Sequence, residues 1–221
     1  MSVCEIAHVT ERLRRCNGID RVVLVADAAN REAAPGADVF IDVGQLGEER
    51  AAVKAVETVE HSGRCLVMTG DMGAVLSEAV SDFLTYAPDA DIIYPIVEKK
   101  DVDAVFPTRS PYYVNTKEGK FTGSSQALFR PSAVVKRTEV LVQMLNARQN
   151  PTSLVGILGA GLALRIALGR PSLKEFQSAL SSSLKLDCRV FISHFPEMFL
   201  TLDSQADVDA MHGFLAGSAG T

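Results

Sequence analysis

The spacing of hydrophobic residues predicts the first elements of the chain. Residues 3–15 place Ile6, Val9 and Leu13 on one side of an amphipathic helix. Continuous apolar runs predict strands buried on both faces, and the segments between them have helical spacing. The predicted strands cover residues 21–26, 38–43, 65–69 and 91–97, and the predicted helices cover residues 48–61 and 78–86. This alternation is typical of an α/β fold with a mostly parallel, Rossmann-like sheet and helices on both faces.

The pattern changes in the second half of the chain. Residues 112–115 and 120–122 flank a Lys-Glu-Gly turn and predict a hairpin. The remaining predictions are strands at 126–129, 189–193 and 199–202, a helical excursion over about 131–183, and a last helix at 204–215. We therefore expect one domain over residues 1–221.

Composition and charge exclude several classes of protein. Apolar residues make up 47% of the chain, enough for a sizeable core. The net charge is −5, the basic residues are scattered and there is no Trp, so a nucleic-acid-binding surface is not expected. The four cysteines have no metal-ligand spacing, which favours a reducing, cytoplasmic location. No signal peptide is visible in the first 15 residues.

One apolar stretch, residues 154–168, has Arg165 as its only charge. It is shorter than the ~20 residues that a membrane-spanning helix needs and contains three glycines. A buried or dimer-facing helix is the preferred interpretation, so we expect no membrane span.

Candidate chemistry centres on Asp71, which follows the apolar run 65–69. Ligands of open α/β sheets gather at the carboxyl ends of strands, where a carboxylate can hold a divalent metal over phosphates. Capping of the turn is an equally good interpretation of Asp71. Asp203 follows a second apolar run and could reach the same edge, although helix capping explains it better.

A second candidate region is residues 121–125, whose backbone N–H groups and hydroxyls could cradle a ligand or simply form a turn. Basic residues near it could contact phosphate, although surface solvation is the default for each. They are Lys99, Lys100, Arg109 and Lys120. His194 has no partner at the spacing of a catalytic triad, and no GxGxxG or GxxxxGK[ST] motif occurs.

Several segments, in this order and spacing, resemble the sugar-nucleotidyltransferase-like (GT-A) proteins of the molybdenum-cofactor guanylyltransferase-like group. The resemblance covers about residues 20–209. It rests on 66–72 (LVMTGDM), 91–97 (DIIYPIV), 104–107 (AVFP), 113–114 (YV), 118–123 (EGKFTG), 147–151 (ARQNP) and 168–173 (LGRPSL). A mostly antiparallel or an all-helical core would contradict it.

The resemblance implies transfer of a nucleotidyl group from a nucleoside triphosphate to a small phosphorylated acceptor, with release of pyrophosphate. It implies Mg²⁺ held by Asp71, with Asp203 as a possible second ligand, and an acceptor side lined by Thr122, Gly123 and Ser125. The further substrate-binding residues expected with it are Gly70, Tyr94, Lys99, Arg109, Tyr113 and Lys120.

The chain also departs from the family. Members open with a strand, a glycine-rich loop that wraps the triphosphate, and a lysine, whereas this chain begins at the helix that follows them. Two interpretations stay open: a shortened reading frame, or a catalytically degenerate homologue that acts as a binding or interaction protein. Without the opening strand, the sheet would expose unpaired edges, so we expect a homo-oligomer, most simply a twofold dimer.

Overall fold

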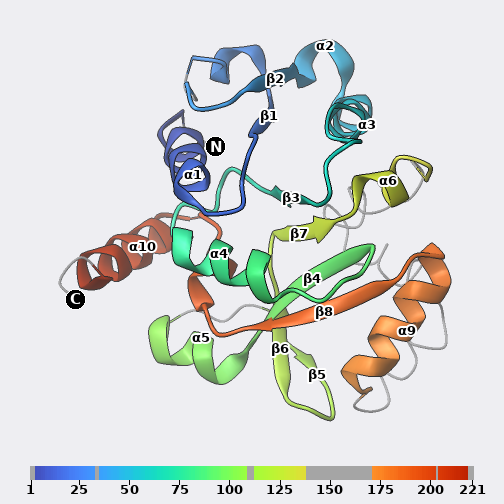
Figure 1. Cartoon of the computed structure of the whole chain (residues 1–221). Helices are drawn as coiled ribbons and strands as arrows, with labels where there is room; N and C mark the ends of the chain where they lie inside the picture. Colours follow the sequence, from blue (N-terminus) through green and yellow to red (C-terminus); the bar gives the residue numbers. More distant parts are fainter. Residues whose placement is uncertain (1–2, 33–34, 109–111, 138–170, 203, 219–221) are drawn as a thin grey trace.

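A computed structural model describes residues 3–32, 35–108, 112–137, 171–202 and 204–218 (Figure 1). The chain begins with α1 (Val3–Arg15), followed by the strands β1 (Val23–Ala26) and β2 (Val39–Asp42). These two strands pair in parallel as a small sheet of their own, with Val23 opposite Val39. Three helices follow these strands closely: η1 (Ala28–Asn30), α2 (Val43–Leu46) and α3 (Glu48–Thr58).

A larger sheet contains the other strands, and most of its pairs are antiparallel. Its strands are β3 (Cys65–Met68), β4 (Ile92–Glu98), β5 (Val114–Asn115), β6 (Lys120–Gly123), β7 (Gln126–Phe129) and β8 (Cys188–Ser193). The pairs β3–β7, β7–β4, β4–β6 and β6–β5 are antiparallel, and only β8 runs parallel to its partner β4. The prediction of a mostly parallel sheet is therefore wrong.

The error has a physical cause. An apolar run shows that a strand is buried, but it carries no information about the direction of its neighbours. The strands β3 and β4 follow each other along the chain with α4 (Ser77–Tyr86) between them, as in a parallel sheet. In space, however, β7 lies between them and runs antiparallel to both. Although β7 comes after β3 and β4 in the sequence, it therefore lies between them in the sheet.

The helices cover the larger sheet and enclose the core. They include α5 (Lys99–Val105), α6 (Pro131–Val134), α9 (Leu173–Leu184), η2 (Pro196–Phe199) and α10 (Gln205–Ser218). Phe83 of α4, Ile93 of β4 and Leu128 of β7 are fully buried together. A second cluster lies under α3, α6 and α9, and a third joins α5 to α10. The core therefore extends along β3, β4, β7 and β8 of the larger sheet.

Most local predictions agree with the structure, but several short elements were missed. Residues 199–202 were predicted as a strand but contain the end of η2, and η1, α2 and α5 fall where no helix was predicted. Ser77 is the first residue of α4, and its hydroxyl donates to the carbonyl of Arg12. The excursion contains α6 and α9, and α9 begins with a capping box between Ser172 and Glu175.

Three further expectations concern the cysteines, the apolar stretch and a membrane span. Cys16, Cys65 and Cys188 are free thiols. The apolar stretch 154–168 lies outside the described residues. None of the helices in the described ranges is long and apolar enough to cross a membrane.

Candidate functional site

Asp71 lies where three segments of the chain meet. The hydroxyl of Thr69, at the end of β3, donates a hydrogen bond to Asp71 Oδ1. The backbone N–H of Thr69 donates to the carbonyl of Ser125 at 3.2 Å, and the N–H of Leu202 donates to the carbonyl of Asp71 at 3.1 Å. Asp71 is therefore fixed between the β6–β7 segment and the chain that follows η2. One carboxylate oxygen is oriented by Thr69, which leaves the other available to a ligand.

Residues 124–125 form a bulge beside Asp71. Both β6 and β7 pair antiparallel with the same strand, β4, but the register shifts between them. Gly123 lies opposite Ile96 and Leu128 lies opposite Ile93, so two extra residues are accommodated between the two ladders. Bulges of this kind bend a strand and redirect side chains, and they are common next to functional sites.

The bulge is held by hydrogen bonds from both sides. Tyr94 Oη of β4 donates to the carbonyl of Ser124 at 2.7 Å, and Ser124 Oγ donates to the carbonyl of Met198 at 2.7 Å. Ser125 therefore follows a fixed residue, and its own carbonyl is bound to Thr69. The predicted acceptor-side residues Gly123 and Ser125 thus lie on a rigid segment next to Asp71.

Tyr94 packs against Gly123 while keeping part of its ring in solvent. A Cβ added to Gly123 would lie 2.3 Å from Tyr94 Oη, so only glycine permits this contact. Burial of the hydroxyl raises the pKa of Tyr94 to about 12. The phenol is therefore neutral at physiological pH and acts as a hydrogen-bond donor.

The loop after Asp71 is packed into the protein. Met72, Ala74 and Val75 are fully buried, and Gly73 fits between Leu202 and Met211. Arg12 of α1 donates through Nη1 to the carbonyl of Val75 at 2.7 Å. The first helix of the chain therefore helps to position the loop that carries Asp71.

A buried polar group that the sequence did not reveal lies beside Arg12. Glu197 of η2 is only 2% exposed, and its Oε1 has no hydrogen-bond partner among the described residues. Burial raises the pKa of Glu197 to about 7, with a further contribution from Glu78, while Arg12 opposes the shift. His8 accepts a hydrogen bond from Arg12 at 2.8 Å. The pKa of His8 is lowered, mainly by burial and also by the positive charge of Arg12.

Gln126 is a second buried polar residue that sequence reasoning missed. It opens β7 directly after the bulge and is 3% exposed. Neither atom of its side-chain amide has a partner within the described part of the chain. Only its position two residues from Ser124 could have drawn attention to it.

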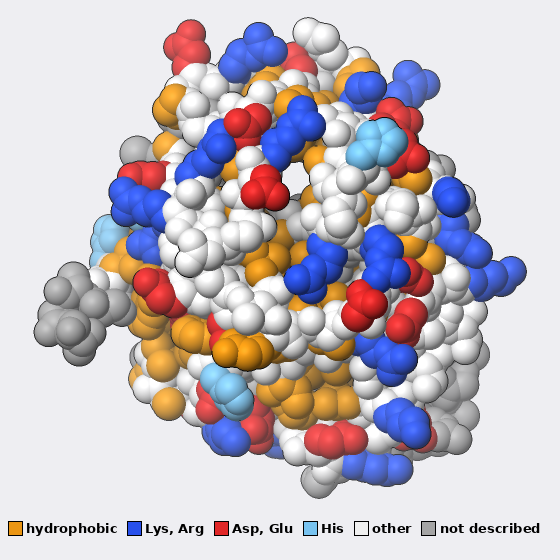
Figure 2. Space-filling model, viewed as in Figure 1, with side chains coloured by type: hydrophobic (Ala, Val, Ile, Leu, Met, Phe, Trp, Pro, Cys, Tyr) orange, Lys and Arg blue, Asp and Glu red, His pale blue; other side chains and the backbone are white. Residues whose placement is uncertain are grey.

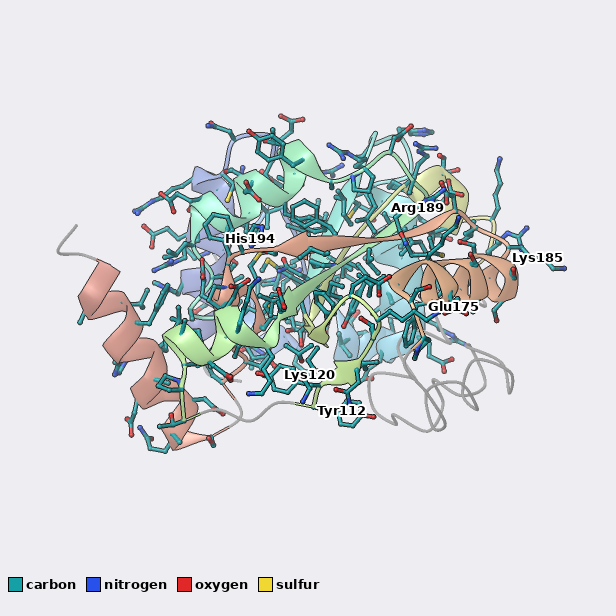
Figure 3. The ribbon with its side chains drawn as sticks, turned by 90° about the horizontal axis from the view of Figure 1, so that it is seen from below. Tyr112, Lys120, Glu175, Lys185, Arg189 and His194 are labelled. Atoms are coloured by element: carbon teal, nitrogen blue, oxygen red, sulfur yellow. The ribbon has the colours of Figure 1, made fainter. Side chains whose placement is uncertain are left out.

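The predicted phosphate-binding residues form a separate group around the β5–β6 hairpin and α5. Lys99 Nζ contacts both carboxylate oxygens of Asp103, at 2.7 and 2.6 Å, and lies 5.1 Å from the centre of the Tyr113 ring. The hydrogen bond to Asp103 raises the pKa of Lys99. Lys120 is exposed on β6 opposite Asn115, and Figure 3 places it near Tyr112, away from His194.

The structure therefore brings only some of the predicted residues together. Gly70, Asp71, Gly123 and Ser125 lie around one turn, with Tyr94 against Gly123. Thr122 is buried in β6 opposite Val97, towards the group with Lys99. Arg109 and Asp203 lie outside the described residues, although Leu202, the neighbour of Asp203, contacts Asp71.

The carboxylate at this turn could contribute to a metal site only together with a substrate. Among the described residues, no group of three or more His, Cys, Asp or Glu side chains could hold a metal ion. Mg²⁺ in phosphate-transfer sites is usually bound by one or two carboxylates together with phosphates and water. Asp71 supplies one carboxylate oxygen of that kind, so phosphate oxygens would have to complete the coordination.

Comparison with known proteins finds similarity among solved structures alone. No family model and no curated protein sequence matches the chain. A 4-diphosphocytidyl-2C-methyl-D-erythritol synthase from Anaerococcus prevotii matches with a TM-score of 0.57 and 10% identity, over 98% of this chain and 86% of that one. Another synthase of this name gives a TM-score of 0.55 and 15% identity, over 97% and 90% of the two chains.

These matches define the fold as nucleotidyltransferase-like. They do not support the molybdenum-cofactor guanylyltransferase-like group in particular, and the mostly antiparallel larger sheet is the result that was expected to contradict that resemblance. A third solved structure, a hypothetical transferase from Thermus thermophilus, is 30% identical with a TM-score of 0.80, over 92% of this chain and 85% of that one. The chain belongs to the same family as this Thermus protein.

Proposed function

We propose that this protein is a nucleotidyltransferase that moves a nucleotidyl group from a nucleoside triphosphate to a small phosphorylated acceptor. The observation that supports this best is the placement of Asp71 at the end of β3, oriented by Thr69 and adjacent to the Ser124–Ser125 bulge. The shared fold with two synthases and the family shared with a protein described as a transferase are consistent with it. The segments quoted from the sequence favour a molybdenum-cofactor guanylyltransferase-like activity.

In the proposed reaction, a phosphate oxygen of the acceptor attacks the α-phosphorus of the triphosphate. The bond between the α-phosphorus and the bridging oxygen breaks, and pyrophosphate leaves with the electron pair. Mg²⁺, when bound, neutralises the charge of the phosphates. Asp71 follows β3 at the edge of the sheet, and the backbone carbonyl of Ser125 in the bulge is bound to Thr69, two residues before Asp71. Positioning and charge stabilisation account for most of the rate in such reactions.

The basic residues of the second group have a supporting role in this proposal. Lys99 is held by Asp103 and Tyr113, so its charge is partly neutralised before any ligand arrives. Lys120 is exposed and can reach a phosphate more freely. Arg109 is the third basic residue proposed for this role.

The alternative is a catalytically degenerate homologue that binds a partner on the same scaffold. It rests on the sequence analysis alone. The two interpretations differ in a simple assay. An active enzyme, given Mg²⁺ and an acceptor, releases pyrophosphate from at least one of the four common nucleoside triphosphates (ATP, GTP, CTP and UTP). A degenerate homologue releases pyrophosphate from none of them.

Replacing Asp71 with asparagine is expected to abolish Mg²⁺-dependent binding of nucleoside triphosphates while leaving the melting temperature nearly unchanged. The amide oxygen of asparagine can still accept the hydrogen bond from Thr69, and the backbone bond from Leu202 is unaffected. The negative charge that a metal requires is lost. Thermal shift with each triphosphate, with and without Mg²⁺, measures both quantities, because a bound ligand raises the melting temperature.

The matched control is Asp209→Asn, which removes an exposed carboxylate on α10. It should bind triphosphates like the unmodified protein. If Asp71→Asn unfolds the protein instead of weakening binding, Asp71 has a structural role and the proposed site is wrong.

A further inference from the structure

The loop between Asp71 and α4 is held at its two ends by different parts of the chain. At the first end, the N–H of Leu202 donates to the carbonyl of Asp71 at 3.1 Å. At the other end, Arg12 Nη1 of α1 donates to the carbonyl of Val75 at 2.7 Å. Inside the loop, the N–H of Val75 donates to the carbonyl of Met72 at 3.2 Å. The position of the loop therefore depends on a long side chain from the first helix.

Arg12 belongs to a small network between α1, the loop and α4. Its Nε donates to Nε2 of His8 at 2.8 Å, so His8 is uncharged in this arrangement. The carbonyl of Gly73 also acts on His8, which places the imidazole beside the same loop. The hydroxyl of Ser77 donates to the carbonyl of Arg12 at 3.1 Å and joins α1 to α4, which lie side by side (Figure 1). The helix α1 therefore reaches the loop through two side chains that are bound to each other.

Glu197 of η2 is a buried carboxyl group close enough to Arg12 for each charge to act on the other. Within the described ranges, Glu197 forms no ion pair, and its Oε1 accepts no hydrogen bond. Both side-chain hydrogen bonds of Arg12 go to neutral acceptors instead. This arrangement suits a protonated Glu197, because a buried carboxylate needs a cation beside it.

The other charged groups around Glu197 leave Arg12 as its partner. Glu78 of α4 acts on Glu197 with a negative charge, which opposes ionisation, whereas Arg12 favours it. Glu11 and Arg15, also on α1, act on Arg12. The helix α5 contacts η2 through apolar residues, and its charged side chains have other partners. These pairs are Lys99 with Asp103, Lys100 with Glu98, and Asp101 with His194.

We propose that Arg12 is a positioning residue for the Asp71 loop and that the charge of Glu197 controls it. A protonated Glu197 leaves Arg12 on the carbonyl of Val75, whereas an ionised Glu197 draws Arg12 away. A guanidinium binds a carboxylate more strongly than a neutral carbonyl, so Arg12 changes partner when the charge appears. Burial raises the pKa of Glu197 to about 7, which places the change near neutral pH. The consequence for ligand binding rests on the proposed function, whereas the movement of the loop does not.

The first test follows the loop itself, by amide exchange in residues 72–76 at about pH 6.5 and about pH 8.5. The unmodified protein and Glu197→Gln are compared at the same pH, because the chemistry of exchange itself depends on pH. The two proteins should differ little at the lower pH. At the higher pH the loop should exchange roughly tenfold faster in the unmodified protein, because glutamine carries no charge and leaves Arg12 in place.

The second test measures the Kd of ATP, GTP, CTP and UTP, each with Mg²⁺, by calorimetry at the same two pH values. From the lower to the higher pH, the Kd of the triphosphate that binds should rise roughly tenfold more in the unmodified protein than in Glu197→Gln. Arg12→Met removes the donor to Val75 and should weaken binding at both pH values. Glu197→Gln should have no further effect in the Arg12→Met background.

The matched control is Arg15→Gln on the same helix. The side chain of Arg15 is 70% exposed and pairs with Glu11, one turn away. Acidic and basic side chains are interspersed over the surface in Figure 2, so the loss of one exposed charge should have little effect. Arg15→Gln should therefore keep the pH profile of the unmodified protein.

Equal exchange of the loop in the unmodified protein and Glu197→Gln at the higher pH would overturn the proposal, whether or not a triphosphate binds. If no triphosphate binds at either pH but the loop opens as expected, the proposed function fails and the control of the loop is supported. Weaker binding by Arg12→Met, with the same pH profile for Glu197→Gln and the unmodified protein, would leave Arg12 a purely structural role. If circular dichroism shows that Arg12→Met is unfolded, Glu197→Gln decides alone.

Discussion

Replacing Glu197 with glutamine is expected to stabilise the protein at pH 8 and above, by about 3 kcal/mol at most. The carboxyl group is buried in η2, its pKa is raised from 4.5 to about 7, and one of its oxygens lacks a partner within the described residues. Above pH 7 the folded protein therefore holds a buried charge that the unfolded chain exposes to water. Glutamine has nearly the same shape and carries no charge.

The sign of the pH dependence follows from the direction of the shift. Between about pH 4.5 and 7, the folded state binds more protons at Glu197 than the unfolded state, so the free energy of unfolding falls as pH rises. Glu197→Gln should remove this fall. The difference between the two proteins is then independent of pH below about 4.5, grows up to about 7, and is constant above it.

Urea denaturation at a series of pH values from 4 to 9 measures this difference. Glu49→Gln, at an exposed glutamate of α3, is the control, and it should change the free energy of unfolding by less than about 0.5 kcal/mol at every pH. Parallel pH profiles for the unmodified protein and Glu197→Gln would show that folding does not raise the pKa of Glu197.

Replacing Gly123 with alanine is expected to destabilise the protein by about 3 kcal/mol. The new methyl group would lie 2.3 Å from Tyr94 Oη and 2.7 Å from Tyr94 Cε1. The ring can avoid this contact only by moving into solvent, which breaks its hydrogen bond to Ser124. The bulge beside Asp71 then loses the hydrogen bond that Tyr94 donates to Ser124.

A double-mutant cycle with Tyr94→Ala isolates this contact. In the Tyr94→Ala background, Gly123→Ala should cost much less, because the ring that it meets is absent. Gly213→Ala on α10 is the matched control, since a methyl group there meets nothing within 4 Å. It should stabilise the protein by up to about 1 kcal/mol. Equal costs of Gly123→Ala in both backgrounds would contradict the contact.

Local elements and the central candidate could be predicted from the sequence, whereas the sheet and the buried charge could not. The helix over residues 3–15 and the strand that ends before Asp71 follow from spacing and continuous apolar runs. The position of β7 between β3 and β4 depends on pairing between distant segments, which no local pattern encodes. The sequence around Gly123 does not show that glycine is required there, because the requirement comes from its contact with Tyr94 of another strand.

Glu197 shows a second limit of sequence reasoning. Its neighbours Pro196, Met198 and Phe199 suggest an ordinary loop next to an apolar run. Only the packing of α1 and α4 against η2 buries the carboxyl group beside Arg12 and Glu78. The resemblance to nucleotidyltransferases, by contrast, depended on several segments in order. The fold of the chain agrees with a nucleotidyltransferase-like fold.

The pairing of β8 with β4 also sets an order of events during folding. Asp187 donates its backbone N–H to Asp91, 96 residues earlier in the chain, and the Asp71 turn is bound to Leu202 still later. Contacts of such long range form slowly, because the intervening chain must first close into a loop. During synthesis on the ribosome, the Asp71 turn cannot reach its final form until nearly the whole chain has left the exit tunnel. Until then the edge strands are open to wrong partners, so this protein should fold after translation and benefit from a chaperone that shields apolar strands.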